Sequence, residues 1–248
     1  MRASQLIAFV HAHPAMARLT RLTFAHESHL VLIHASASRA LFVDDVDRRR
    51  FLEALLNSAR AAAVSVHAYA LLDEQIALLA TPDLAQGIEK MMQRLGRRYV
   101  AAFNARHHLS GPLWRSRYGT AAIDMEALGR LAFQFVEQAP VRAGRVSSAQ
   151  EWPWSSAPHH TGGARSLVLR EHQLHWKLGN TPFEREARHA AVLTENPDSA
   201  EMSALLTQVM RGWPIGPSEF KNRLAASSGR DVVPRKRGRP RKESGAQS

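Results

Sequence analysis

The sequence contains no cysteine, so disulfide bonds and thiolate metal sites are excluded from the outset. It also lacks any apolar run close to the roughly 18 residues that a membrane-spanning helix needs. The short apolar run at residues 6–10 is interrupted by His11 and His13, whereas a secretory signal needs roughly 7–15 apolar residues. From these absences we expect a cytoplasmic protein that does not associate with a membrane.

Positive charge is what the chain has in excess. Its 248 residues include 33 lysines and arginines against 22 aspartates and glutamates, which gives a formal net charge of +11. This balance favours polyanionic partners, with nucleic acid first and an anionic membrane surface second. The apolar fraction of 45% is typical of a globular protein, and the length suits one medium domain with an appendage.

The most regular pattern lies at residues 64–82, where two apolar, β-prone runs flank the polar pair Asp73 and Glu74. This pattern predicts a β-hairpin that is buried on at least one face. The other elements predicted for the first 140 residues are a strand at 29–36, helices at 46–62 and 84–107, a strand at about 113–123 and a helix at 126–138. The order strand, helix, two strands, helix, strand predicts an α+β protein with a ferredoxin-like antiparallel sheet and helices on one face.

Acidic residues precede two of these helices. Asp44 or Asp45 is expected to cap the first helix, and Asp83 the second, because a carboxylate satisfies the free amides of a first turn. Beyond about residue 163 the pattern changes to short helices separated by asparagine, glycine and proline. We therefore expect four segments: 1–15, a disordered or mis-assigned start; 16–162, the main domain; 163–230, a small helical module; and 231–248, a disordered basic tail.

The tail carries a basic run around Gly238-Arg239-Pro240, which resembles an AT-hook. Glycine lets the backbone enter a narrow minor groove, and proline keeps the segment extended. Residues 234–248 hold six basic residues and one acidic residue, so five of the eleven net positive charges lie here. The alternative is a generic basic tail held by counterion release. The residues of this tail that we expect to contact DNA are Arg235, Lys236, Arg237, Arg239, Arg241 and Lys242.

Several runs of the first 160 residues resemble the HUH-type single-tyrosine transposases, most closely the REP-associated tyrosine transposase branch. The runs are FVDDVDRRRFL at 42–52, RLGRRY at 94–99, QAPVRAG at 138–144 and WPWSS at 152–156. The resemblance implies a protein whose relatives break and rejoin single-stranded DNA. In that family a Pro-Asn-His-x-His motif opens the second hairpin strand, and its two histidines hold a divalent metal that polarises the scissile phosphate.

The positions that match this motif read Asp-Glu-Gln-Ile-Ala, so Gln75 and Ala77 stand where the family has its histidines. Alanine offers no ligand atom and glutamine only a weak amide oxygen, so the resemblance implies a degenerate metal site. Asp73 and Glu74 carry oxygen ligands that suit Mg²⁺, and the alternative for them is a solvated turn. No cofactor is expected; Mg²⁺ or Mn²⁺ would bind only if this site still functions.

Two strand histidines, His34 and His67, are weaker candidates, because a lone histidine in a strand is more often packed or hydrogen-bonded. Tyr99 matches the family's nucleophile, which forms a covalent phosphotyrosine link. It also lies within the apolar stripe of its predicted helix, so packing is the alternative role. Trp114 and Tyr118 are interleaved with arginines, as in platforms on which bases stack. The basic residues expected to bind nucleic acid in the main domain are Lys90, Arg94, Arg97, Arg98, Arg115 and Arg117.

Three functions are compatible with these observations. The first, which we predict, is a DNA-binding protein of REP-associated tyrosine transposase type whose catalytic centre is impaired. It would bind single-stranded hairpin or AT-rich duplex DNA, with a homodimer as one possible form. The second is an active, metal-dependent transesterase that uses Tyr99, and the third is a regulatory or RNA-binding module.

Overall fold

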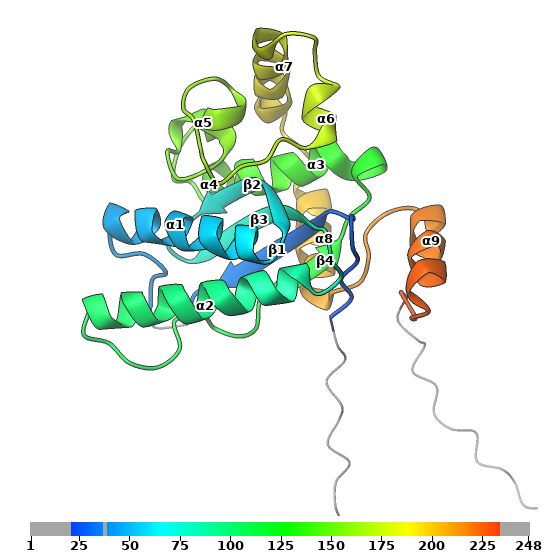
Figure 1. The fold of residues 1–248 in the computed structure, drawn as a ribbon. Helices are drawn as coiled ribbons and strands as arrows, with labels where there is room; N and C mark the ends of the chain where they lie inside the picture. The colour runs from blue at the N-terminus through cyan, green and yellow to red at the C-terminus, as the bar shows by residue number, and fades with distance from the viewer. Residues whose placement is uncertain (1–20, 37–38, 234–248) are drawn as a thin grey trace, which may run out of the picture.

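The centre of the protein is a four-stranded antiparallel sheet with the strand order β2-β3-β1-β4 (Figure 1). The computed structural model describes residues 21–36 and 39–233. The strands are β1 (His29–His34), β2 (Val64–Leu71), β3 (Gln75–Pro82) and β4 (Gly119–Ala122). Together with the helices they confirm the predicted α+β class and its antiparallel, ferredoxin-like strand order.

The predicted hairpin is present as β2 and β3. Leu71 pairs with Ile76, and the amide of Leu72 donates to the carbonyl of Gln75 over 2.8 Å, which closes the turn. The register shifts between Val66 and Ala68, so that a bulge interrupts β2. On its other edge β3 pairs with β1, so that β3 lies inside the sheet and β2 forms one of its edges.

Two long helices, α1 (Asp45–Ala61) and α2 (Gly87–Arg106), lie side by side on one face of the sheet (Figure 1). The Asp44 carboxylate accepts from the amide of Asp47 over 3.1 Å, so the predicted cap of α1 is confirmed. Phe51 and Leu55 of α1 and Leu95 of α2 are completely buried and belong to one apolar cluster with the sheet residues of this face. We call this layer the α1–α2 face.

The second face of the sheet is covered as well, which the predicted arrangement with helices on one face did not include. Helices α3 (Met125–Glu137) and α8 (Ser199–Arg211) lie on it. Val136 of α3 and Val209 of α8 are completely buried in a cluster with Leu30 and Leu79 of the sheet. We call this layer the α3–α8 face. The prediction of one helical layer was made from the first 140 residues. Part of the second layer is α8, which lies far beyond them in the chain.

The remaining helices are short or peripheral. They are α4 (Ala139–Arg142), the 3₁₀ turn η1 (Ala149–Glu151), α5 (Ala157–His160), α6 (Gln173–Trp176), α7 (Pro182–Thr194) and α9 (Ser218–Ser228). Figure 1 shows α5, α6 and α7 beyond α3 at the top of the view, while α9 stands apart at its right-hand side. Phe220 and Leu224 of α9 pack against Leu22 and Phe24, which lie just before β1.

Two predicted details are corrected. Asp83 does not cap α2, which begins at Gly87 after an N-cap, Gln86, that makes no side-chain hydrogen bond. Any Cβ at position 87 would lie 2.7 Å from Pro82 Cβ, so the helix starts where a glycine allows its closest approach to β3. The last strand is also shorter than predicted, because residues 113–118 form an irregular loop instead of regular strand.

That loop is held against the end of β1. The amide of Ser36 donates to Leu113 O, and that of Arg115 to His34 O, both over 2.9 Å. Within the described ranges, none of the helices combines the length and the apolarity that crossing a lipid bilayer requires.

Candidate functional site

The two positions that the sequence analysis aligned with the family's metal-binding histidines, Gln75 and Ala77, lie at the start of β3. Gln75 pairs with His34 of β1 and is partly exposed. Ala77 is only 1% exposed and packs in the apolar cluster of the α3–α8 face. Because alternate residues of a strand share a side, Gln75 points toward the same face. One of the two positions thus carries a methyl group inside a packed core.

The two acidic residues beside them are engaged in ion pairs. The Asp73 carboxylate contacts the Arg48 guanidinium over 2.5 Å, and Glu74 contacts Arg145 over 3.1 Å. Both form the hairpin turn, as the solvated-turn alternative describes. Arginine partners compete with any metal ion for these oxygens.

Tyr99 lies in the core of the opposite face. Its side chain is 2% exposed, and its hydroxyl donates to the Leu41 carbonyl over 2.6 Å. Its ring packs edge-on against Phe51, with the centroids 5.0 Å apart. Burial raises the pKa of the hydroxyl far above its ordinary value of 10, and the charge of Asp47 raises it further. The structure therefore gives Tyr99 the surroundings of a packed core residue.

Tyr99 and Ala77, which match catalytic positions of the family that the sequence resembles, lie on opposite sides of the sheet. Tyr99 belongs to the apolar cluster of the α1–α2 face, whereas Ala77 belongs to that of the α3–α8 face. A metal beside Gln75 and a nucleophile at Tyr99 would lie on different sides of a packed layer. The sequence could not show this, because the two segments are separated along the chain by a complete turn and half a helix.

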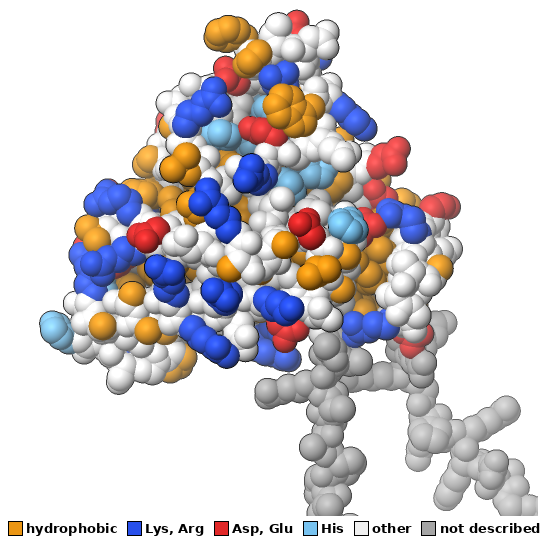
Figure 2. Space-filling view, viewed as in Figure 1, with side chains coloured by type: hydrophobic (Ala, Val, Ile, Leu, Met, Phe, Trp, Pro, Cys, Tyr) orange, Lys and Arg blue, Asp and Glu red, His pale blue; other side chains and the backbone are white. Residues whose placement is uncertain are grey.

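The basic residues of α2 do gather on one surface. Lys90, Arg94, Arg97 and Arg98 are all exposed, because the apolar stripe of the same helix is turned toward the sheet. Helix α1 adds Arg49, Arg50 and Arg60, which are exposed and which the sequence analysis did not single out. Figure 2 shows lysine and arginine side chains in a band along the outer side of these two helices. We call this surface the basic band.

The two arginines of the loop before β4, Arg115 and Arg117, are exposed too. The aromatic rings on either side of this pair, Trp114 and Tyr118, are not free for base stacking, which corrects that expectation. The Trp114 ring lies against Gly96, where any Cβ would be 2.9 Å from Trp114 Cη2. The Arg21 guanidinium covers the Tyr118 ring at 3.8 Å from its centroid. The loop thus carries exposed positive charge but no exposed aromatic ring on which a base could stack.

A cluster of histidines and glutamates lies on the far side of α3, and sequence reasoning missed it. Glu137 of α3 is completely buried; His160 Nδ1 donates to its Oε1 and His189 Nε2 to its Oε2, both over 2.6 Å. Burial acts to raise the pKa of Glu137, but His160 and His189 outweigh it and hold this pKa well below its usual value. The signal that could have found the cluster is the pair His159-His160, followed by further histidines at 172, 175 and 189.

Glu171 is the second carboxylate of the cluster. It accepts from His159 Nε2 over 3.0 Å and lies near His160 and His175. Although burial acts to raise it, the pKa of Glu171 is lowered to about 2, first by the hydrogen bond from His159 and then by the charge of His160. Burial lowers the pKa of His175 to about 4, so its ring is neutral at neutral pH.

The two strand histidines, His67 and His34, form no hydrogen bond or ion pair with the carboxylates of that cluster. His67 Nδ1 donates to Arg170 O over 2.6 Å, and its Nε2 lies 2.9 Å from the Thr81 hydroxyl, so both ring nitrogens are occupied. Burial lowers the pKa of His67 to about 4. His34 is partly exposed beside Arg115, and burial, followed by that charge, lowers its pKa.

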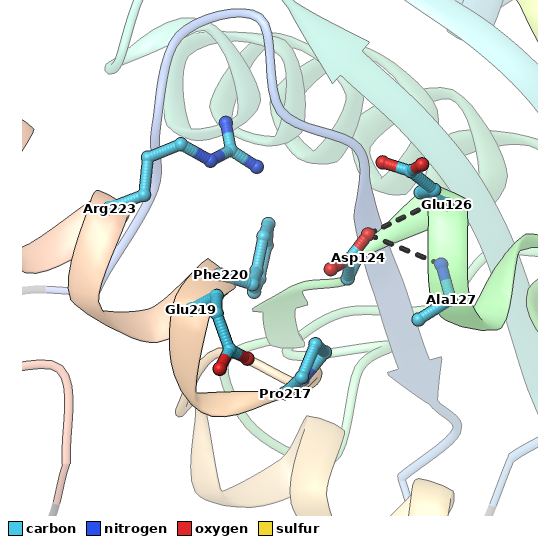
Figure 3. A pocket seen from close by; sticks show the side chains of 7 residues that line it. All are labelled: Asp124, Glu126, Ala127, Pro217, Glu219, Phe220 and Arg223. Atoms are coloured by element: carbon cyan, nitrogen blue, oxygen red, sulfur yellow. Dashed lines mark hydrogen bonds between the residues drawn. The ribbon is translucent and has the colours of Figure 1, made fainter.

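An open pocket of about 380 Å³ lies between the start of α3 and α9 (Figure 3). Three carboxylates border it, and the one of Asp124 accepts from the amide of Glu126 over 2.9 Å and caps α3. Arg223 borders it as well but is paired with Glu27 over 2.5 Å. This acidic lining does not suit a phosphate, and the pocket is formed by elements outside the basic band.

The solved structures that are similar to this chain include two transposases. No family model matches the sequence, and no curated protein matches it. A REP-associated tyrosine transposase bound to a REP hairpin is 13% identical, with a TM-score of 0.48, and the match covers 63% of this chain and 99% of that one. A putative transposase from Deinococcus radiodurans is 16% identical, with a TM-score of 0.34, over 49% and 93% of the two chains. At this low identity, what is inferred for the chain depends on its own residues.

Proposed function

We propose that this protein binds DNA through the basic band and does not cleave it. The observation that carries the proposal is the exposure of four basic residues on one side of α2, beside three more on α1. Among the described residues, Lys90, Arg94 and Arg97 form no ion pair, and Arg98 reaches Glu53 only at 4.0 Å with both side chains exposed. Exposed charges without partners are free to neutralise phosphates.

The spacing of the band suits a phosphate backbone. Residues 90, 94 and 98 are successive i, i+4 neighbours on one side of a helix. At about 1.5 Å per residue they span about 12 Å along the axis, which is the rise of roughly three to four nucleotides of one DNA strand. Arg115 and Arg117 extend the same positive charge from the loop before β4. The band is continuous enough to follow several phosphates.

Loss of cleavage is proposed on three grounds. Ala77 supplies no ligand atom, Asp73 is paired with Arg48, and the Tyr99 hydroxyl donates to a backbone carbonyl on the other side of the sheet. The alternative of an active transesterase would need a nucleophile and a metal on the same side. We therefore expect binding without scission.

The form of DNA is proposed from the sequence. The resemblance to REP-associated tyrosine transposases favours a single-stranded hairpin, and the AT-hook-like run of the tail favours AT-rich duplex. The basic tail residues from Arg235 to Lys242 lie outside the described part of the chain, so their contribution stays a prediction. A homodimer that clamps a hairpin also stays a prediction, which the stoichiometry of the complex would test.

The test is gel retardation of the full chain with four probes: a DNA hairpin, AT-rich duplex, GC-rich duplex and an RNA hairpin, each with Mg²⁺ or Mn²⁺. Retardation is scored separately from cleavage and from covalent attachment. We expect retardation of the DNA hairpin or the AT-rich duplex without product. A covalent adduct that disappears in Tyr99→Phe would overturn the loss of cleavage, and equal affinity for the RNA hairpin would favour the RNA-binding alternative.

The double variant Arg94→Ala/Arg97→Ala tests the surface. Its matched control is Arg211→Ala, an exposed arginine at the end of α8. We expect the double variant alone to weaken binding to every probe, because phosphate contacts carry no sequence information. Equal binding by both variants would contradict the assignment to the basic band.

A further inference from the structure

The basic band consists of two rows of exposed cations, one on each helix. The α1 row is Arg49, Arg50 and Arg60, and the α2 row is Lys90, Arg94, Arg97 and Arg98. Within the described ranges, none of the α1 row lies in an ion pair. Figure 2 shows lysine and arginine side chains over both helices. A ligand on this surface therefore meets positive charge from two elements.

Contacts at the two ends of the helices place the rows side by side. Arg106, at the end of α2, pairs with Asp44, the N-cap of α1, over 2.5 Å. At the other end, a Cβ at Gly87 of α2 would lie 3.3 Å from Ala62 O, just after α1. The helices therefore run antiparallel along their whole length, and Arg60 lies at the end where α2 begins.

The seam between the rows is exposed. Glu53 of α1 and Arg98 of α2 approach to 4.0 Å across it, with side chains that are 69% and 61% exposed. The outer sides of the two helices thus form one continuous surface. Glu53 places a negative charge between the two rows, where it opposes the binding of a polyanion.

The pair of helices is too wide to enter a groove of DNA. A helix with its side chains is about 10–12 Å across, and packed helices lie about 8–10 Å apart, so the pair presents a surface about 20 Å wide. The major groove of B-DNA is only about 12 Å wide, and the minor groove about 6 Å. Since α1 and α2 lie side by side (Figure 1), neither can enter a groove before the other meets the backbone. The rows then contact phosphates instead of base edges.

The separation of the rows suits the minor groove. It is close to the distance of about 8–10 Å between the helix axes. Phosphates line both walls of a groove, and the minor groove's walls are about 6 Å apart, so its phosphate rows lie a little farther apart than that. Along the axis, Arg49 and Arg60 are about 16 Å apart, which is the rise of roughly four to five nucleotides of one strand. Each row can therefore follow one strand.

We propose that the basic band binds the double helix across its minor groove, with the α1 row on the phosphates of one strand and the α2 row on those of the other. This inference rests on the proposed DNA binding and names the part of the DNA that is bound, the paired stem of a hairpin. Unpaired bases gain little here, because the neighbouring rings of Trp114 and Tyr118 are covered. A single strand follows only the α2 row, which has more cations, and releases fewer counterions.

The first test measures the affinity of the full chain over a salt series, for a DNA hairpin and for an oligo-dT of the same length. Arg49→Ala/Arg60→Ala should lower the slope of log affinity against log salt by about 2 for the hairpin and by less than about 0.5 for the oligo-dT. Lys90→Ala/Arg94→Ala should lower it for both probes, and Arg211→Ala for neither. An equal loss for both probes in the α1 variant would overturn the contact with two strands. Far-UV circular dichroism checks that each variant is folded.

Neutral methylphosphonates in one arm of the stem test the two strands separately. The parent chain should bind this probe more weakly, with its α2 row on the arm that is still charged. Arg49→Ala/Arg60→Ala should then bind it as tightly as the parent chain does, because the α1 row no longer has phosphates to contact. A further loss in the variant would mean that both rows contact the same strand, which contradicts the proposal.

Glu53→Gln tests the seam by a gain of affinity. It removes the negative charge between the rows and keeps the shape of the side chain. Affinity for the hairpin should rise about 2–5-fold at low salt and less at high salt, because salt screens exposed charges. Glu201→Gln, an exposed carboxylate of α8 on the other face of the sheet, should leave it unchanged. An unchanged affinity in Glu53→Gln would place the DNA away from the seam and overturn the proposal.

A stem with the same base composition in scrambled order completes the test. It should bind within about 3-fold of the original, because phosphate contacts carry no sequence information. A preference above about 10-fold for one order would mean that base edges are read, which contradicts a band that stays outside the grooves. Failure of the underlying DNA binding has a different result, since the parent chain would then retain none of the probes at low salt.

Discussion

The two faces of the sheet are built in opposite ways. The α1–α2 face has an apolar interior that includes Tyr99 and a positively charged exterior. The α3–α8 face has an equally apolar interior, but behind α3 it leads into buried histidines and carboxylates. One side presents charge to solvent and the other keeps charge inside. The comparison separates a surface whose positive charges are exposed from an interior in which buried carboxylates and imidazoles pair with one another.

The largest expected effect is on the interior side. Glu137→Ala should lower the free energy of unfolding by about 3–5 kcal/mol, because it leaves His160, His189 and Ser156 without their shared buried partner. Urea denaturation measures this. Glu53→Ala, an exposed carboxylate of α1, is the control and should stay within about 0.5 kcal/mol of the parent. If both variants lowered the free energy of unfolding by a similar amount, the buried carboxylate would be no more important to stability than an exposed one, which contradicts the prediction.

The next effect is on the pH dependence of stability. The pKa of His67 is lowered to about 4 from 6.5, so between these values the unfolded chain binds a proton that the folded chain does not. Stability should therefore be complete above pH 6.5 and fall as the pH drops toward 4, by roughly 3 kcal/mol at most for this group.

His67→Gln keeps a polar side chain and should flatten that fall. Urea denaturation at several pH values measures the slope for both proteins. His108→Asn, which changes an exposed histidine, should leave the slope as it is. An unchanged slope in His67→Gln would mean that this ring does not titrate as its burial predicts.

A smaller effect is expected inside the α1–α2 face. Tyr99→Phe should cost about 1–3 kcal/mol, because the Leu41 carbonyl loses its donor while the ring still packs. Retardation of a DNA hairpin should be unchanged, since the hydroxyl does not reach the basic band. Thermal or urea unfolding measures the change in stability, and gel retardation measures DNA binding. A loss of binding without a loss of stability would place Tyr99 in the DNA-binding site.

The smallest effect on stability belongs to the surface. Arg94→Ala/Arg97→Ala should change the free energy of unfolding by less than about 0.5 kcal/mol. The slope of log affinity against log salt should fall by about 1 for each phosphate contact removed, so by about 2. Binding measured over a salt series checks this. A loss of stability with an unchanged slope would mean that these arginines serve the fold.

The sequence predicted the elements whose causes are local. Alternation in the hairpin, the Asp44 cap and the apolar stripe of α2 each depend on neighbours within a few positions, and all three are present. The exposure of the basic residues of α2 followed from the same stripe. Local patterns also suggested Asp83 as a cap, which failed because the approach of α2 to Pro82 decides where that helix starts.

What could not be predicted depends on distant contacts. The side of the sheet on which Tyr99 lies, relative to Ala77, is fixed by which face α2 covers. The cluster of histidines and glutamates behind α3 joins positions 137, 160, 171 and 189, and no short motif contains them. The sequence suggested that the Trp114 ring could stack on a base, but the ring packs against Gly96 of α2. Each of these is set by packing between elements that are far apart in the chain.

The placement of α8 has a consequence for how the chain matures during synthesis. Val209 covers Leu30 and other sheet residues, and Met210 Sδ lies 2.6 Å from where any Cβ of Gly119 would be, so this helix fits tightly against β4. A nascent chain whose first 160 residues have left the ribosome has α3 on this face of the sheet but still exposes the apolar part that α8 covers, at β1 and β4. Until α8 emerges, that part is open to chaperones or to other unfinished copies.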